Sequence, residues 1–282
     1  MNVQALALKA EQLRKLHRGP RMLVLPNAWD VISARIVEES GFPAIATTSA
    51  GIAATLGYPD GQKISREEML SVVARIAKAV HVPVTADMEA GYGVTIDDMT
   101  QTVKAVVAAG AVGMNLEDVI AGDGGSQVDL ALQVEKIRAI RRATESLGVP
   151  LVLNARTDIY LIPIGPVETR FDRTVERLRA YREAGADCLF APGLKNPDTI
   201  AKLVRAVNGP LNILLMPGMP TLRELENMGV ARASAGSGVM RATLGLTRRI
   251  AKEMLEAGTY TSMLEDTVPF AEVNELLARE KS

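Results

Sequence analysis

From residue 21 onward, short apolar runs alternate with longer segments of helical period, and this alternation constrains the fold more than any other feature. Each run stays apolar until its last residues, as expected for parallel strands that helices cover on one side and packed side chains fill on the other. Eight such β/α units favour a closed (β/α)₈ barrel of the TIM type over an open doubly wound sheet. The predicted strands are residues 21–29, 43–49, 83–89, 111–118, 150–158, 187–192, 212–217 and 231–237.

The segments between the runs show the usual pattern of helix capping, with Ser or Thr at the start and Gly near the end. No linker rich in Pro, Gly or Ser divides the 282 residues, so we expect a single α/β domain over 1–282. After the eighth unit the chain continues with YTSMLEDTVPFAEVNELLARE, which predicts at least one further helix. We therefore expect residues 239–282 to form an additional C-terminal helical segment.

The charge balance is nearly neutral, with 32 Lys and Arg residues against 33 Asp and Glu residues and no basic run. The electrostatic signature of a nucleic-acid-binding protein is missing, so we expect a small-molecule partner and no nucleic acid. Cys188 is the single cysteine, which excludes an intrachain disulfide and is typical of a cytoplasmic protein. No apolar stretch approaches the ~18 residues of a membrane-spanning helix, so no membrane partner is expected.

Acidic side chains gather at the predicted carboxyl ends of two neighbouring strands, where barrel enzymes carry their catalytic groups. Asp87 and Glu89 end the third run two residues apart, so on a strand their side chains would leave on the same face. Such a pair persists with a shared proton or a bound cation, and oxygen ligands suit Mg²⁺. Glu117 ends the fourth run after AVGMNL, where an unpaired carboxylate would be costly. The three acids predict a metal site, the alternative being a helix cap and a surface acid.

Further polar candidates follow the second and fifth runs. Arg156 ends the fifth run, where its guanidinium could bind a substrate carboxylate, pair with Glu117 or Asp158, or do both. The small residues of TTSAG after the second run allow close backbone approach, so the amides near Ser49 and Ala50 could form an anion-binding nest.

Two aspartates have explanations that need no ligand. Asp60 belongs to the segment YPDG, which is a good turn sequence because Pro presets one dihedral angle and Gly accepts a positive one. Asp118 directly follows Glu117 and would point the other way on a strand. We expect Asp118 to be a structural partner for a loop or a helix N-terminus.

Taken together, TTSAG, LGYPDG, TADMEAGYG, NLED and NARTD, in this order and each after its own strand, resemble the isocitrate lyase and phosphoenolpyruvate mutase superfamily. The resemblance covers nearly the whole chain. It implies a barrel whose last helix is exchanged between subunits, and thus a homodimer or homotetramer. It also implies Mg²⁺ as cofactor, with Mn²⁺ as a substitute, and a small 2-oxo or 2-hydroxy carboxylic acid as substrate.

Carried over position by position, the resemblance gives each candidate a role. Asp87 would be the direct metal ligand, whereas Asp60, Glu89 and Glu117 would act mainly through metal-bound waters. Asp60, Glu117 and Arg156 become the candidate catalytic residues. The family usually has Asp where this chain has Glu89, which is longer by one methylene. The candidate substrate-binding residues are Thr48, Ser49, Ala50, Asp87 and Arg156.

The loop after the fourth predicted strand departs from the family. Lyases that cleave isocitrate or methylisocitrate carry a Lys/Arg-Cys-Gly-His motif there, and phosphonate-forming mutases carry a stretch like Lys-Thr-Asn-Ser. This chain reads VIAGDGGSQVDLA and has neither. At the end of the sixth run, Pro192 stands about where relatives place a His or Glu.

The surviving motifs predict a Mg²⁺-dependent lyase that breaks or forms a C–C bond beside the carbonyl of an oxaloacetate-like 2-oxo or 2-hydroxy acid, through a metal-stabilised enolate. The proton donor would be water on the metal or a residue of the loop at 119–128. One alternative is a phosphonopyruvate-type mutase or hydrolase that acts on a P–C bond. The other is a non-catalytic barrel that binds keto acids.

Overall fold

The computed structural model describes residues 2–120, 125–162 and 164–278. Its main sheet has nine strands in the order β1-β11-β10-β9-β8-β5-β4-β3-β2, and every pair in it is parallel. Each of the eight predicted runs coincides with a strand to within one residue at its start or lies around one, so the TIM-type barrel is confirmed. The strands are β1 Leu23–Leu25, β2 Asn27–Ala28, β3 Ile45–Thr47, β4 Val84–Asp87, β5 Gly113–Glu117, β8 Val152–Arg156, β9 Cys188–Phe190, β10 Leu211–Leu214 and β11 Arg232–Ser234.

The first predicted strand is divided in two, and the barrel closes at this division. β1 pairs with β11 and β2 pairs with β3, so one short segment serves both ends of the sheet. Pro26 separates the two pieces and has no N–H to donate to a ladder. The side chain of Asn27 accepts a hydrogen bond of 2.8 Å from the Gly236 amide across the junction. We call this junction, formed by residues 23–28 and 232–236, the seam.

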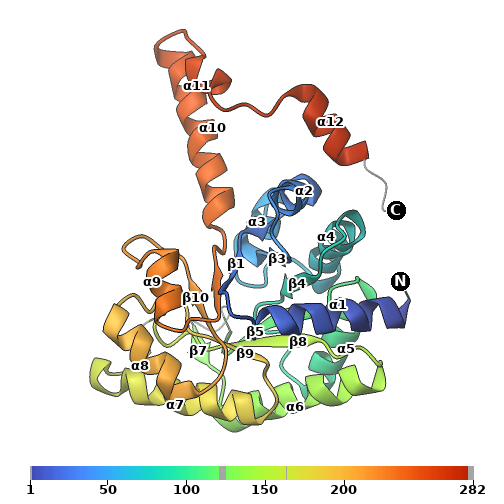
Figure 1. Ribbon diagram of the computed structural model, residues 1–282, viewed down its shortest axis with the longest axis vertical. Helices are drawn as coiled ribbons and strands as arrows, with labels where there is room; N and C mark the ends of the chain where they lie inside the picture. The colour runs from blue at the N-terminus through green and yellow to red at the C-terminus, as the bar shows by residue number, and fades with distance from the viewer. Residues whose placement is uncertain (1, 121–124, 163, 279–282) are drawn as a thin grey trace.

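Helices surround the sheet, and α1 lies across its amino-terminal end (Figure 1). A Cβ atom on Gly113 at the start of β5 would come 2.7 Å from Leu13 Cδ2 of α1, so this close approach requires glycine. The helices are α1 Val3–Leu16, α2 Val31–Glu39, α3 Ser49–Thr55, α4 Arg66–Ala79, α5 Ile96–Ala108, α6 Leu130–Ser146, α7 Val167–Glu183, α8 Pro197–Val207 and α9 Leu222–Asn227.

The predicted C-terminal helical segment is present. It comprises α10 Gly238–Glu256, α11 Thr261–Leu264 and α12 Phe270–Ala278. Figure 1 shows α10 projecting away from the barrel, and α12 returning to pack against α2. Met240, in the first turn, is the single buried residue of α10. The other residues of this helix are partly or fully exposed in the single chain.

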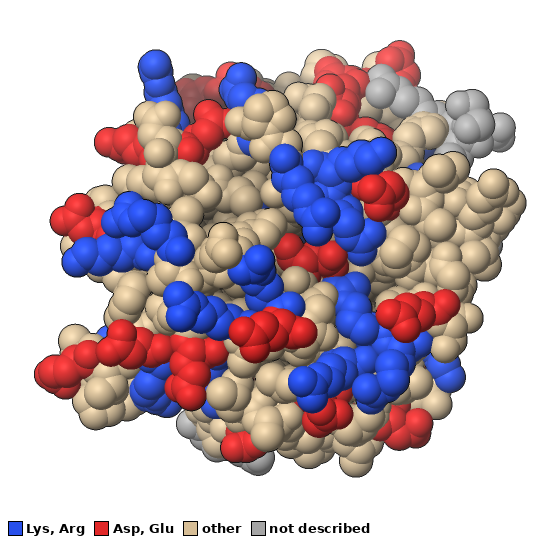
Figure 2. Space-filling view, turned by 60° about the horizontal axis from the view of Figure 1, so that its bottom comes forward, with Lys and Arg blue, Asp and Glu red and all other residues tan. Residues whose placement is uncertain are grey.

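The loop after β5 begins and ends in a small antiparallel hairpin of β6 Val119–Ile120 and β7 Ser126–Gln127. Within the predicted donor loop at 119–128, residues 121–124 lie outside the described residues. Elsewhere on the surface, basic and acidic side chains are interspersed on the face shown in Figure 2, in keeping with the nearly neutral composition. Among the described helices, none is both long and apolar enough to span a membrane.

Candidate active site

A pocket of about 550 Å³ opens at the carboxyl ends of the barrel strands. One part of its lining is polar and comes from β4, β5 and β8, through Asp87, Asn115 and Arg156. Another part is apolar and includes Phe190 of β9 and Leu214 of β10. The lining also includes Thr48, Ser49, Ala50, Asp60, the segment Ser234–Gly238 and Arg241.

Asp87, the last residue of β4, is held by the first turn of α3. Its Oδ2 accepts hydrogen bonds from the backbone N–H of Ser49 at 3.1 Å and from the Ser49 hydroxyl at 2.9 Å. Its own amide donates to the Thr47 hydroxyl at 2.9 Å. The Ser49 amide, predicted to bind a substrate oxygen, therefore binds the Asp87 carboxylate in this structure. Thr48 is the N-cap of α3, and its hydroxyl accepts from the Gly51 amide.

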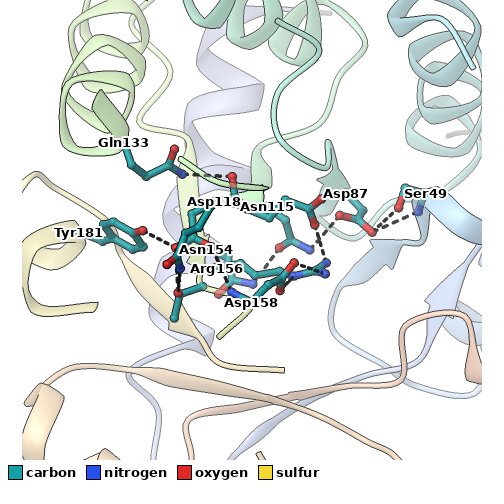
Figure 3. Close-up of polar contacts among 12 residues, drawn as sticks. Ser49, Asp87, Asn115, Asp118, Gln133, Asn154, Arg156, Asp158 and Tyr181 are labelled. Carbon is teal, nitrogen blue, oxygen red and sulfur yellow. Dashed lines mark hydrogen bonds and ion pairs between the residues drawn. The ribbon is translucent and has the colours of Figure 1, made fainter. Parts of the chain in front are cut away.

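Two asparagines extend the polar network from Asp87 across the barrel interior (Figure 3). Asn115 Nδ2 donates to Asp87 Oδ1 at 3.4 Å, and Asn154 Nδ2 donates to Asn115 Oδ1 at 2.7 Å. The three residues are consecutive partners in the register of β4, β5 and β8, so their side chains share the inner face of the sheet. This chain of hydrogen bonds fixes the orientation of the Asp87 carboxylate.

Arg156 forms ion pairs with both acids that the sequence offered as partners. Its Nη1 lies 2.7 Å from Glu117 Oε2, and its Nε and Nη2 lie 2.5 and 2.9 Å from the two oxygens of Asp158. Burial alone would lower the pKa of Arg156, but Glu117 and Asp158 offset this effect and raise it. The guanidinium also lies over the Phe190 ring, 5.8 Å from its centroid. Arg156 is therefore a rigid, permanently charged wall of the pocket.

The four acids proposed for the metal site influence one another, but they occupy different positions. Of the described residues, Asp60 and Asp87 line the pocket, whereas Glu89 and Glu117 are buried outside its lining. Burial and the Asp87 carboxylate raise the pKa of Asp60. Burial, together with Asp87 and Asp60, raises the pKa of Glu89 to about 7. Burial likewise raises the pKa of Glu117, although Arg156 opposes this rise.

This cluster suits a hydrated divalent cation. Among the described residues, no three His, Cys, Asp or Glu side chains form a ready set of direct ligands. Mg²⁺ commonly uses one or two carboxylates and keeps several waters, so it does not require such a set. The repulsion that raises the pKa of Asp60 and Glu89 would also be relieved by a cation. The direct role of Asp87 and the water-mediated roles of Asp60, Glu89 and Glu117 remain predictions.

Asp118 has the structural role that its position on the strand predicted. It is completely buried and receives a hydrogen bond of 2.7 Å from the Tyr181 hydroxyl and an ion pair of 3.0 Å from Arg177. The Thr157 hydroxyl and the Asp158 amide also donate to it, at 2.8 and 3.1 Å. Asp118 thus joins the end of β5 to α7 and to the segment that carries Asp158.

Several residues of the site were not singled out from the sequence, namely Asn115 and Arg241 in the pocket lining and the buried Asn154 behind Asn115. Asn115 and Asn154 stand two residues before Glu117 and Arg156, so the two-residue period of a strand places each pair on one face. The two-residue spacing within NLE and NAR is the sequence signal that could have identified both asparagines. Arg241 had no comparable signal, because its contact with the pocket depends on the direction in which α10 leaves β11.

Comparison with known proteins identifies the family. A model of the phosphoenolpyruvate phosphomutase family matches residues 13–255. The chain therefore belongs to this family, within the isocitrate lyase and phosphoenolpyruvate mutase superfamily, whose members are lyases and mutases.

Three relatives illustrate the range of the family. A structure from Burkholderia cenocepacia J2315, described as a candidate lyase/mutase, is 39% identical, with a TM-score of 0.90 and 98% of each chain covered. An oxaloacetate decarboxylase from Bradyrhizobium diazoefficiens is 30% identical, over 72% of this chain and 69% of the relative. The structure of an oxaloacetate acetylhydrolase with its product oxalate is 26% identical, with a TM-score of 0.83, over 95% of this chain and 93% of that one.

Proposed function

We propose that this protein is a Mg²⁺-dependent lyase that breaks a C–C bond beside the carbonyl of a small 2-oxo acid of the oxaloacetate type. The supporting observation is the pocket, which brings the acids Asp87 and Asp60 within reach of the same ligand as the cation Arg156. Relatives that act on oxaloacetate, a decarboxylase and an acetylhydrolase, support the choice of substrate class.

The chain supplies groups for both ends of such a substrate. A bound Mg²⁺ would supply a Lewis acid that polarises the substrate carbonyl, with Asp87 as its direct ligand. Arg156 uses one N–H on Glu117 and two on Asp158, and a guanidinium has five. The two that remain can donate to a substrate carboxylate. Thr48 and Ala50 also line the pocket, where they can contact the keto acid.

Decarboxylation is compatible with the family motifs that this chain retains. When the C–C bond of oxaloacetate breaks, its electron pair stays on the three-carbon fragment, CO₂ departs, and the enolate of pyruvate takes up one proton. This reaction does not require the cysteine of the isocitrate-cleaving lyases. The fixed positive charge of Arg156 favours the developing negative charge.

The proposal is tested by incubating the purified protein with 2-oxo, 2-hydroxy and phosphonate acids, with Mg²⁺ or with a chelator, and by following pyruvate release. We expect pyruvate from an oxaloacetate-type acid and none with the chelator. Asp87→Ala should abolish turnover, whereas Asp97→Ala, at an exposed position of α5, should not change it. Turnover that survives the chelator contradicts the proposed mechanism. Thermal stabilisation by oxalate and Mg²⁺ without any product would instead indicate a non-catalytic keto-acid-binding protein.

A phosphonopyruvate-type mutase or hydrolase is the second candidate, because the matching family model is that of a phosphomutase. It predicts activity on phosphonopyruvate and none on oxaloacetate. The same panel of acids therefore separates the two candidates directly.

We further propose that the protein acts as a homodimer or homotetramer in which the C-terminal helices cover a second subunit. α10 to α12 expose large apolar side chains that a single chain leaves in contact with water, which is unfavourable for a patch of this kind. They include Leu244, Met254, Leu255, Tyr260, Leu264 and Phe270, which are 45–87% exposed.

A further inference from the structure

Glu89, Gln62 and Tyr92 close a ring of hydrogen bonds beside the pocket. The backbone N–H of Gln62 donates to Glu89 Oε2 at 2.7 Å, and the Tyr92 hydroxyl donates to Glu89 Oε1 at 3.2 Å. The backbone N–H of Tyr92 in turn donates to the side-chain Oε1 of Gln62 at 2.7 Å. Both carboxylate oxygens of Glu89 are therefore engaged. We call these three residues the latch.

The latch holds its own backbone in an unfavourable conformation. Gln62, Glu89 and Tyr92 have φ values of 56°, 48° and 56°, in the left-handed region that side chains other than glycine rarely adopt. Among the described residues only Asn208 and Asp266 share this property without being glycine. Such strained residues persist only where the surrounding structure holds them, and they concentrate at functional sites. The ring of hydrogen bonds supplies that restraint.

The latch joins two segments that carry predicted metal-site residues. Gln62 lies two residues after Asp60, in the loop between α3 and α4, and Glu89 lies two residues after Asp87, at the end of β4. The backbone of Glu89 is itself fixed, because its carbonyl accepts from the Glu117 amide at 2.9 Å. The Asp60 loop is thus tied to a rigid strand end.

We propose that Gln62, Glu89 and Tyr92 are positioning residues that hold Asp60 at the pocket, and that Glu89 serves this site through the latch. The inference rests on the proposed function only in assigning Asp60 a part in turnover. It also accounts for the glutamate at a position where the family usually has aspartate. A carboxylate shorter by one methylene would withdraw from the Gln62 amide or from the Tyr92 hydroxyl.

A double-mutant cycle tests the inference with Tyr92→Phe, Asp60→Ala and the combination of both. We expect Tyr92→Phe alone to lower kcat/KM about five- to tenfold, the effect of one lost hydrogen bond, and to have no further effect when Asp60 is already absent. An equal loss in both backgrounds overturns the proposal. Tyr58→Phe is the matched control, because the Tyr58 hydroxyl lies in the same loop and, among the described residues, donates to the exposed Glu68 at 3.3 Å instead of to the latch.

Amide hydrogen exchange gives a readout that needs no turnover. In the unmodified protein, the Gln62 and Tyr92 amides should exchange slowly, because each donates to a side chain of the latch. Tyr92→Phe should speed exchange over residues 58–63, and Tyr58→Phe should not. Unchanged exchange in Tyr92→Phe overturns the latch even if the enzyme turns over oxaloacetate. Faster exchange in a protein that acts on none of the acids would leave the latch standing and contradict only the proposed function.

Discussion

The mouth of the barrel and the C-terminal helices differ in which side chains they bury and which they expose. At the mouth, Arg156 is largely buried and forms ion pairs with Glu117 and Asp158. Along α10 and α12, apolar side chains remain exposed, and Leu255 and Phe270 reach 87% and 85%. A buried charge without its partner is costly, and so is an apolar surface left in water. The described charged groups around Arg156 therefore find partners within one chain, whereas the apolar side chains of the helices would be covered by the proposed second subunit.

The largest effect expected for a residue at the mouth of the barrel is at Asp87. Replacement by Ala should lower kcat at least about 1,000-fold, because the direct ligand of the proposed Mg²⁺ would be lost. The melting temperature should change little, because Asp87 is only partly buried. The measurements are steady-state kinetics and thermal unfolding of the same preparation. Activity within tenfold of the unmodified protein would show that Asp87 does not hold the metal.

The pairing at the mouth predicts a large stability effect at Arg156. Arg156→Met removes the cation shared by Glu117 and Asp158, so we expect the free energy of unfolding to fall by about 3–5 kcal/mol at neutral pH. Arg156→Lys keeps the charge and should lose less. Urea unfolding measures both. A loss below about 1 kcal/mol for Arg156→Met would mean that the two acids are neutral in the folded protein.

The C-terminal helices predict a change in association rather than in barrel stability. Leu255→Glu should weaken self-association by about 100-fold, because it places a charge within the proposed apolar contact. The melting temperature of the barrel, measured at low protein concentration, should stay nearly constant. Leu8→Glu, at an exposed position of α1, is the control. Sedimentation velocity decides the outcome, and an unchanged oligomer for Leu255→Glu would exclude this surface as the contact.

The smallest expected effect concerns the pH dependence of stability at Glu89. Its pKa in the folded protein is about 7, above the value of 4.5 for an unperturbed glutamate. The folded state therefore binds more protons than the unfolded state in this window, and stability should fall as pH rises from about 4.5 to 7. Without divalent cations the decrease should be about 2–3 kcal/mol, and Glu89→Gln should flatten it. A slope equal in the two proteins would show that another group titrates here.

The barrel could be predicted from the sequence because buried parallel strands appear as apolar runs and the helices between them begin and end with capping residues. The sequence also predicted which residues end at the mouth, since Asp87, Glu117 and Arg156 are the last residues of β4, β5 and β8. The alternation of side-chain direction along the strand, however, did not continue past the end of β4. Glu89 takes a left-handed conformation, and its carboxylate reaches the Asp60 loop instead of the pocket.

Pairwise contacts were harder to predict than positions on the strands. The choice of Arg156 between Glu117 and Asp158 depends on side-chain conformations, and the answer was that both pairs form. That the Ser49 amide binds Asp87 depends on how closely α3 approaches β4. Neither distance is recorded in the periodicity of the chain, because both come from packing between segments far apart in sequence.

The seam has a consequence for the order of events during synthesis. Its hydrogen bond between Asn27 and Gly236 joins residues 209 positions apart, so the barrel cannot close until Gly236 has left the ribosome. Until then, β2 and the latest strand made are open edges, which are prone to pair with other chains. Closing so long a loop is also entropically costly, which slows folding. The nascent barrel therefore passes through an open sheet, and its last strand is the one that seals it.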